Sequence, residues 1–363
     1  YAFPVGSTTV VAVVTDIHGN VSDCSFTVVV EDLQVPVIER PVPVASYDAD
    51  AGACHATLSF AALAFDNCGV ADIVYLVDDE VISFPYDFPV GTTTVVILAT
   101  DIHGNTSTSS FTVVVQDVEP PVVSCPVPAN PYPTDEGACS STLSFAATST
   151  DNCGIAGAVY SVNGNAITFP FVFPVGTTIV DVVVTDIHGN TAGCSFSVSV
   201  EDVESPHVTC PVPASAYNTD PGQCSRSLSF NALSTDNCAV ASMQYMLNGN
   251  EITFPYNFPV ASTTVTLLVT DIHGNVASCA FVVTITDVEA PVVSCPVPLS
   301  SYSTDANECN RTLSFVATAT DNCGVSSIVY SIGNNPVTFP YDFPVGSTTV
   351  NAKATDVHGN ISN

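Results

Sequence analysis

Residues 100–105 read TDIHGN, and this phrase recurs along the chain at a fixed interval. The other copies begin at Thr15, Thr185, Thr270 and, as TDVHGN, at Thr355. A second phrase, FPVG, keeps the same interval, with copies at Phe3, Phe88, Phe173, Phe343 and, as FPVA, at Phe258. A fixed period of this size indicates an array of similar modules.

One period, residues 119–203, contains short apolar runs separated by turn signals and no helical periodicity. Leu143 and Phe145 alternate with polar residues, as in a half-buried strand. Asn163-Gly164-Asn165 is a hairpin turn signal, and residues 177–185 form a long β-branched run. We predict an all-β fold of tandem immunoglobulin-like antiparallel β-sandwiches with an 85-residue period. Short linkers that contain proline favour an elongated, stiff rod.

The period defines the expected domains. Residues 34–118, 119–203 and 204–288 are complete repeats, 1–33 is the C-terminal part of a repeat, and 289–363 is an incomplete one. Because the chain starts and stops within a repeat, we expect it to be part of a longer protein.

Composition restricts the class of protein. The chain has 35 acidic and 4 basic residues and a formal net charge of -31, which argues against binding to nucleic acid or to an anionic membrane surface. No apolar run is long enough to enter and span a bilayer. The 14 cysteines recur at four fixed places in small repeats, a pattern typical of disulfides formed in an extracellular or cell-surface location.

Several motifs in a fixed order resemble the hyalin repeat (HYR) family. They are CP near the start of the repeat, DNCG, FPVGTTTV, TDxxGN, and then CxFxVxV and DxxxP. The resemblance covers the whole chain. It implies an immunoglobulin-like fold in tandem copies, found in extracellular, adhesive and matrix proteins, and it does not imply an enzyme.

Differences between repeats suggest which cysteines pair. In residues 34–118 the first place is Arg40 and the fourth is Ser109, while Cys54 and Cys68 remain. Two places lost together suggest that first pairs with fourth, which predicts Cys125–Cys194 and Cys210–Cys279. By elimination, second pairs with third within each repeat, which predicts Cys54–Cys68, Cys139–Cys153, Cys224–Cys238 and Cys309–Cys323. Partners of Cys24 and Cys295 would lie outside the sequence.

The second pairing makes a demand on the chain. Residues 14 apart on a straight strand lie about 45 Å from each other, whereas the Cα atoms of a disulfide lie less than about 7 Å apart. The chain would have to double back after Phe145. The alternative is that some thiols are free.

Carboxylates and asparagines gather at three places in each period: the linker, the DNC loop and the DIHGN loop. In an immunoglobulin-like topology these two loops lie at the pole where the linker arrives. Oxygen ligands of this kind suit Ca²⁺, which takes six to eight of them. The candidate calcium ligands are Asp32, Asp66, Asp101, Asn105, Asp117, Glu119, Asp151, Asp186, Asn190, Asp202, Glu204, Asp236, Asp271, Asn275, Asp287, Glu289, Asp321, Asp356 and Asn360.

An alternative explanation is that Asp and Asn occur in these loops because their side chains cap turns. Repulsion among unpaired acids at one joint favours calcium. A fourth recurring acid, at Asp50, Asp135, Asp220 and Asp305, is expected at the opposite pole of its own repeat, as a turn residue.

No constellation predicts catalysis. The histidine of DIHGN recurs once per repeat without a second His or Cys ligand close in sequence, so we expect a turn residue whose ring packs or hydrogen-bonds locally. Gly104 and its copies are expected to supply a positive φ. We predict a structural segment of a secreted or cell-surface fibre, stalk or matrix polymer, whose partners are neighbouring repeats or copies of itself. The alternatives are an adhesin that binds glycans or a protein partner, and an enzyme whose catalytic domain lies outside this sequence.

Overall fold

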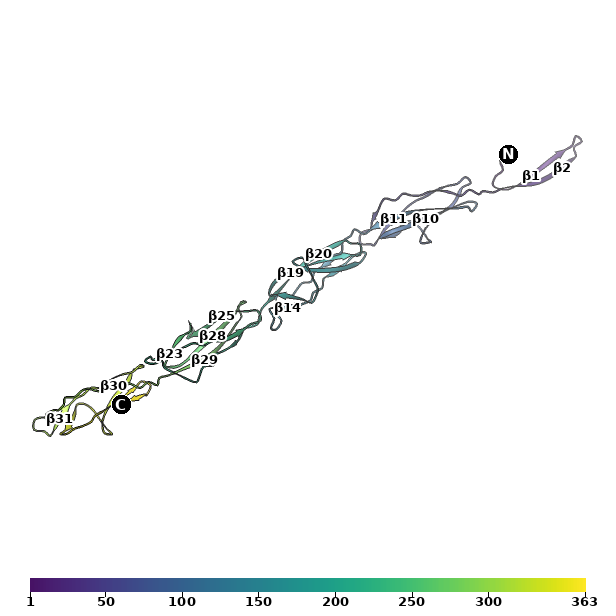
Figure 1. Ribbon diagram of the computed structural model, residues 1–363. Helices are drawn as coiled ribbons and strands as arrows, with labels where there is room; N and C mark the ends of the chain where they lie inside the picture. The colour runs from purple at the N-terminus through teal and green to yellow at the C-terminus, as the bar shows by residue number, and fades with distance from the viewer. The chain divides into compact units, whose positions relative to one another are not determined.

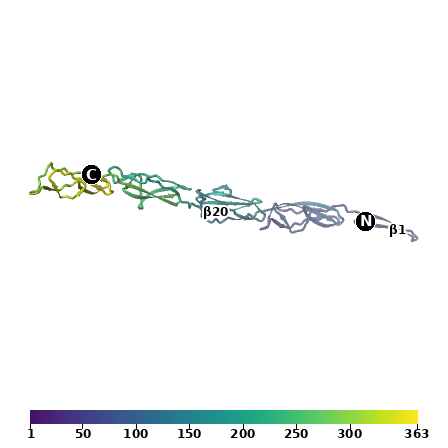
Figure 2. The same cartoon turned by 90° about the horizontal axis from the view of Figure 1, so that it is seen from below.

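A computed structural model describes all 363 residues and contains strands and loops but no helix (Figure 1, Figure 2). Accordingly, no helix has the length and hydropathy needed to cross a membrane. The predicted all-β fold is confirmed. The chain divides into two compact units, which we describe separately. Unit 1 comprises Tyr1–Ala129, Leu143–Phe171 and Thr177–Val198, and unit 2 comprises Asn130–Thr142, Val172–Gly176 and Ser199–Asn363.

Residues 34–118 lie in unit 1 and form three sheets. The five-stranded sheet has the order β4-β11-β10-β7-β8, in which β4 is parallel to β11 and the other pairs are antiparallel. Two-stranded sheets join β3 to β6 and β5 to β9. The strands are β3 (Val37–Glu39), β4 (Tyr47–Asp48), β5 (His55–Leu58), β6 (Leu63–Phe65), β7 (Val70–Val77), β8 (Glu80–Ile82), β9 (Tyr86–Pro89), β10 (Gly91–Asp101) and β11 (Thr106–Gln116).

Residues 204–288 lie in unit 2 and repeat this topology. The five-stranded sheet has the order β22-β29-β28-β25-β26, and β21 pairs with β24 and β23 with β27. The strands are β21 (His207–Thr209), β22 (Tyr217–Asn218), β23 (Ser225–Leu228), β24 (Leu233–Thr235), β25 (Val240–Leu247), β26 (Asn250–Ile252), β27 (Tyr256–Pro259), β28 (Ala261–Asp271) and β29 (Val276–Thr286).

Residues 119–203 contribute to both units. In unit 1, β12 pairs with β15, and β16 pairs with β17 and β19. In unit 2, Tyr132 of β13 pairs with Val200 of β20. The strands are β12 (Val122–Ser124), β13 (Tyr132–Pro133), β14 (Ser140–Leu143), β15 (Thr148–Thr150), β16 (Ile155–Val162), β17 (Asn165–Ile167), β18 (Phe171–Pro174), β19 (Gly176–Asp186) and β20 (Thr191–Glu201).

The remaining strands belong to the first and last segments of the chain. An N-terminal hairpin in unit 1 consists of β1 (Gly6–Thr15) and β2 (Val21–Val30). Residues 289–363 in unit 2 contain β30 (Val292–Ser294), β31 (Asn310–Leu313), β32 (Thr318–Thr320), β33 (Val325–Ile332), β34 (Asn335–Val337), β35 (Tyr341–Pro344), β36 (Asn351–Asp356) and β37 (Ile361–Ser362).

The core of residues 34–118 follows from the alternation along its two longest strands, because successive side chains of a strand face opposite sides. Val95 and Ile97 of β10 and Val113 of β11 are fully buried, while the residues between them are more exposed. Phe88, from the FPVG phrase, is also fully buried among them. In residues 204–288 the equivalent Phe258 lies at the centre of a matching core. The recurring phrase therefore marks a core aromatic residue.

Candidate functional site

The DIHGN loop is held together by its aspartate and asparagine. Asp101 closes β10 at a register shift and is 1% exposed. Its Oδ1 accepts the backbone N–H groups of His103 and Asn105, both at 2.8 Å, and its Oδ2 accepts Asn105 Nδ2 at 2.7 Å. Gly104 has φ +94°, as predicted for the turn. Burial, the largest influence, raises the pKa of Asp101, but the hydrogen bonds outweigh it and hold that pKa below its usual range.

The DNC loop uses a second aspartate in a similar way. Oδ1 of Asp66 accepts the backbone N–H groups of Cys68 and Gly69, at 2.8 and 3.1 Å. The other carboxylate oxygen is buried and has no hydrogen-bond partner. The same unpartnered oxygen occurs in the next three repeats, at Asp151, Asp236 and Asp321.

The linker aspartate lies beneath both loops of the following repeat. At Asp117, whose side chain is 0% exposed, Oδ2 lies 3.1 Å from His188 Nδ1, and the backbone oxygen accepts Asn190 Nδ2 at 3.2 Å. Asn152 of the DNC loop donates to Asp117 Oδ1 at 3.4 Å. The same contacts recur at Asp32, Asp202 and Asp287. The predicted convergence of linker and loops is therefore confirmed, and we call each such cluster a joint.

The histidine of DIHGN has a partner that the sequence alone does not indicate. We expected a local contact, but His188 Nδ1 contacts a carboxylate 71 residues earlier in the chain. The distance is 3.1–3.2 Å at all four joints. The ring therefore connects two repeats. No local sequence signal could have revealed this contact.

Three of the four joints, those of Asp117, Asp202 and Asp287, also contain a turn from the preceding repeat. Gly52 donates its backbone N–H to Glu119 Oε2 at 2.8 Å, and Asn152 Nδ2 donates to the backbone oxygen of Ala53 at 2.9 Å. Glu204 and Glu289 accept the equivalent bonds from Gly137 and Gly222. The turn that starts at Asp50 lies at the pole of its own repeat opposite the DIHGN loop, as expected. Because the repeats follow one another in tandem, that pole contacts the linker and the DNC loop of the next repeat. The linker glutamates thus engage the preceding repeat.

This arrangement overturns one of the two predicted disulfide pairings. The second cysteine of each repeat bonds to the third cysteine of the next repeat, with Cα–Cα distances of 4.8, 4.6 and 4.7 Å. These bridges are Cys54–Cys153, Cys139–Cys238 and Cys224–Cys323. The predicted pairs Cys54–Cys68, Cys139–Cys153, Cys224–Cys238 and Cys309–Cys323 are therefore wrong.

The physical reason is the position of the two cysteines. In residues 34–118, Cys54 lies beside the turn at one pole of the repeat and Cys68 in the DNC loop at the other, so the chain between them does not double back. Cys68 and Cys309 are unpaired here, and the places 99 residues away from them lie outside the sequence. The sequence did carry a signal against pairing within a repeat: two residues 14 apart on a straight strand lie about 45 Å from each other, too far for a disulfide.

The first-to-fourth pairing is confirmed. Cys125–Cys194 and Cys210–Cys279 are both bridges within one repeat, with Cα–Cα distances of 5.9 Å. In residues 34–118, where Arg40 and Ser109 replace the two cysteines, Arg40 Nη1 donates to the backbone oxygen of Ser110 at 2.7 Å. A hydrogen bond thus connects the two segments that the disulfide joins elsewhere. Cys24 and Cys295 are unpaired and exposed.

The chemistry of the joint restricts which metals it could hold. Ligand atoms of Asp117, Cys153 and His188 lie within 4.8 Å of one another, but Cys153 is in a disulfide and cannot offer a thiolate. Burial, and then the neighbouring Asp32, raise the pKa of the corresponding Cys68 thiol, which favours its neutral form. Carboxylate oxygens of Asp32, Asp66 and Asp101 also lie within 4.8 Å of one another. The donor set therefore fits a cation that prefers oxygen.

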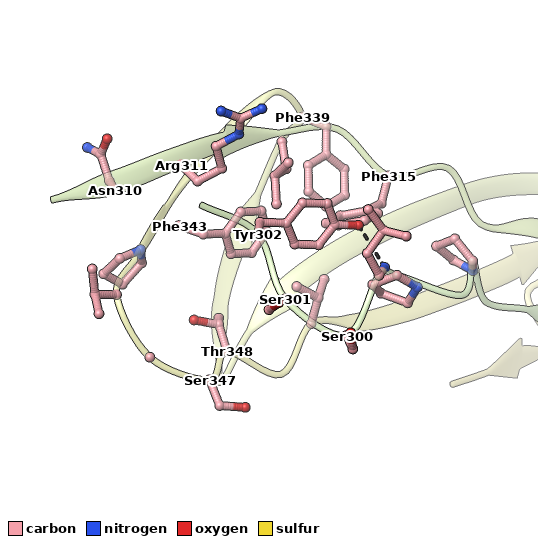
Figure 3. A pocket seen from close by; sticks show the side chains of 18 of the residues that line it. Ser300, Ser301, Tyr302, Asn310, Arg311, Phe315, Phe339, Phe343, Ser347 and Thr348 are labelled. Carbon is pink, nitrogen blue, oxygen red and sulfur yellow. Dashed lines mark hydrogen bonds between the residues drawn. The ribbon is translucent and has the colours of Figure 1, made fainter. Parts of the chain in front are cut away.

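A cavity in residues 289–363 is lined by aromatic side chains, among them Tyr302, Phe315 and Phe343 (Figure 3). The hydroxyl of Tyr302 accepts the backbone N–H of Leu299 at 3.0 Å. In residues 34–118 and 204–288 the ring equivalent to Phe315 contacts a phenylalanine of the last strand, with centroids 5.2 Å apart. The cavity corresponds to the place that the phenylalanine of the last strand, Phe111 or Phe281, fills in those repeats, and we assign no ligand to it.

Comparison with known proteins gives consistent results. Residues 116–200 and 201–285 match the family model of the HYR domain. Hyalin of Lytechinus variegatus is 29% identical over 364 residues, which cover 94% of this chain and 66% of that protein. Hyalin of Strongylocentrotus purpuratus is 31% identical over 379 residues, which cover 99% of this chain and 30% of that protein. The chain thus spans less than two thirds of either relative.

Among solved structures, the extracellular domain of protocadherin GammaB4 matches with a TM-score of 0.32 and 13% identity. The match covers 98% of this chain and 70% of that one.

Proposed function

We propose that this chain, which contains two tandem HYR domains, is a structural segment of a secreted or cell-surface fibre, stalk or matrix polymer. The main support is the joint, which recurs four times with the same contacts between linker, loops and histidine. A protein that recognises diverse ligands is expected to vary its loops, whereas here the loops are the most uniform part of the repeat. Disulfides in every complete repeat agree with an oxidising, extracellular location.

We propose further that calcium binds at the joints. Two observations support this: one buried carboxylate oxygen per joint lacks a hydrogen-bond partner, and three carboxylates gather within reach of one ion. At the joint of Asp117, the ligands would come from Asp117, Asp151 and Asp186. The ion would supply positive charge to a chain with a net charge of -31. The competing explanation is that these aspartates only cap turns. Oδ1 of Asp151 and Oδ1 of Asp186 already accept backbone N–H groups of their own loops, as turn capping requires.

Calorimetric titration with calcium chloride tests the second proposal. Wild-type protein stripped with chelator should bind calcium and unfold at a higher temperature with the ion present. Asp151→Asn should weaken binding at one joint. Asp181→Asn is a matched control, because Asp181 is exposed on β19 and carries the same charge away from the joints. No binding heat with the wild type would leave only the turn-capping role.

Immunogold labelling of the source cells with an antibody to the chain tests the structural role. Label along extracellular fibres or matrix would support it, and label confined to the cytosol would refute it. A glycan array separates the adhesin alternative, since selective, saturable binding to one glycan class would favour adhesion over a purely structural role.

A further inference from the structure

The three bridges between repeats overlap along the chain. Cys139, where the second bridge begins, precedes Cys153, where the first bridge ends. Cys224 and Cys238 stand in the same relation for the third and second bridges. A covalent path therefore runs from Cys54 across to Cys153, back along the chain to Cys139, across to Cys238, and onward in the same pattern to Cys323.

We propose that this path carries tension along the array, so that the repeats between Cys54 and Cys323 cannot lengthen by unfolding while the bridges are intact. The biological use of this property rests on the structural role proposed above. The connectivity itself does not, because it depends only on the three disulfides.

The lengths decide how much the path restricts extension. The direct chain runs through all of residues 54–323, whereas the bridged path includes only two short backbone segments, 139–153 and 224–238. At no more than about 3.6 Å per residue, and with three bridges of about 5 Å each, the path is about 115 Å long when taut. The same chain without any bridge could extend to about 970 Å.

The path is already close to taut in the folded repeat. In residues 204–288, which contain the path segment 224–238, β29 leads from one joint, at Asn275, to the next, at Asp287, and its 11 residues span about 37 Å. The path segment within one repeat connects the same two poles and can reach at most about 50 Å. Slack of roughly ten ångströms per repeat is far less than the length that an unfolded repeat would release.

The disulfides within repeats lie off this path. Cys125–Cys194 and Cys210–Cys279 could be absent without interrupting it. Residues 34–118 lack the internal bridge, yet all four repeats from residue 34 onward keep the second and third cysteines. The sequence therefore keeps the cysteines of the path and dispenses with an internal pair.

Single-molecule stretching of the full chain between Tyr1 and Asn363 tests the proposal. One variant replaces the path cysteines Cys54, Cys139, Cys224, Cys153, Cys238 and Cys323 by Ser. A matched control replaces Cys125, Cys194, Cys210 and Cys279 by Ser. Between Cys54 and Cys323, the wild type and the control should extend to about 115 Å, and the path variant to about 480 Å, limited by its two internal bridges. A wild type that extends as far as the path variant would overturn the proposal.

Backbone cleavage gives a second test that needs no cysteine variant to fold. A protease site placed in the linker between Glu201 and Pro206 is spanned only by Cys139–Cys238. After cleavage the chain should run as one 37.6 kDa species without reductant and as two fragments with it. Separation without reductant would refute the path. That result would leave calcium binding and fibre labelling to be judged by their own experiments, and a failure of those would leave this path intact.

Discussion

Residues 34–118 and 204–288 share strand order and core but differ in how they are cross-linked. Phe88 and Phe258 occupy the same fully buried position. The second of these repeats has the Cys210–Cys279 bridge, whereas the first has only the hydrogen bond from Arg40. Packing of the sheets around the shared core is therefore sufficient to specify the fold, and the internal bridge adds stability to it. The joints, by contrast, are built alike in both repeats.

The largest expected effect is the loss of the central aromatic residue. Phe88→Ala or Phe258→Ala should each destabilise its own repeat by about 3–5 kcal/mol, because a fully buried ring leaves a cavity. Residues 34–118 should be affected more severely in practice, since no internal bridge limits their unfolded state. Hydrogen exchange measured separately for each repeat checks this. Equal protection in the wild type and in Phe88→Ala would show that the ring does not support the core.

Removal of the internal bridge should reduce the difference between the two repeats. The Cys210–Cys279 bridge closes a loop with a sequence separation of 69 residues, and in the chain-entropy account its loss lowers the free energy of unfolding by about 4 kcal/mol. The loss is smaller where the bridges across joints already restrict the unfolded chain. Cys210→Ser with Cys279→Ser should lower the stability of residues 204–288 toward that of residues 34–118. We expect residues 34–118 to be the least stable complete repeat in the wild type. Single-molecule unfolding of a variant without the three bridges between repeats measures the order. If residues 34–118 needed the highest unfolding force of the complete repeats, this expectation would be wrong.

The sequence predicted the fold because the information lies within one repeat. Alternating residues such as Val95 and Ile97, and the turn glycine Gly104, define strands and loops locally. The convergence of the linker and the two loops also followed from the topology expected of one domain. Calcium binding was predicted from the same residues and stays a prediction.

The missing part of the site depends on contacts between consecutive repeats. Cys54 and Cys153 are 99 residues apart, and Gly52 and Glu119 are 67 apart, in different repeats. The interpretation within one domain made the chain double back so that Cys54 could reach Cys68 in the DNC loop, and it did not consider that stacking brings opposite poles of consecutive repeats together. The strict period contained the necessary clue, because it places the second cysteine of one repeat and the third cysteine of the next at the same separation throughout the chain.

A smaller effect is expected where a hydrogen bond stands in for the bridge. Arg40→Ala removes the bond to the backbone oxygen of Ser110 and should cost residues 34–118 about 1 kcal/mol. Arg226→Ala is the comparison in residues 204–288, because Arg226 forms a half-exposed ion pair with Asp220 at 3.1 Å. Such pairs contribute about 0–1 kcal/mol. Chemical denaturation of both variants measures the two values, and a larger loss for Arg226→Ala would show that Arg40 does not replace the bridge.

The smallest expected difference between the two repeats lies in their response to acid. Burial raises the pKa of Asp101 and of Asp271, but hydrogen bonds led by those from Asn105 and Asn275 outweigh it, and both pKa values lie below the usual range. A carboxyl group whose pKa is lowered by folding stabilises the folded state fully above its unfolded pKa, which is about 3.9. That stabilisation is lost as the pH falls through the folded pKa.

Both repeats should therefore keep this contribution near neutral pH and lose it together below about pH 4, so that their difference in stability stays constant. The free energy of unfolding of each repeat, measured by hydrogen exchange at several pH values between 7 and 3, gives that difference. Asp101→Asn should weaken residues 34–118 at pH 7, because an amide offers one acceptor oxygen in place of the two that accept the three bonds of the loop, and should flatten their response to acid. Residues 204–288 of the same molecule, with Asp271 intact, are the internal control. If the response of residues 34–118 stays as steep as in the wild type, other carboxyl groups determine it, and the DIHGN aspartate does not couple this repeat to pH.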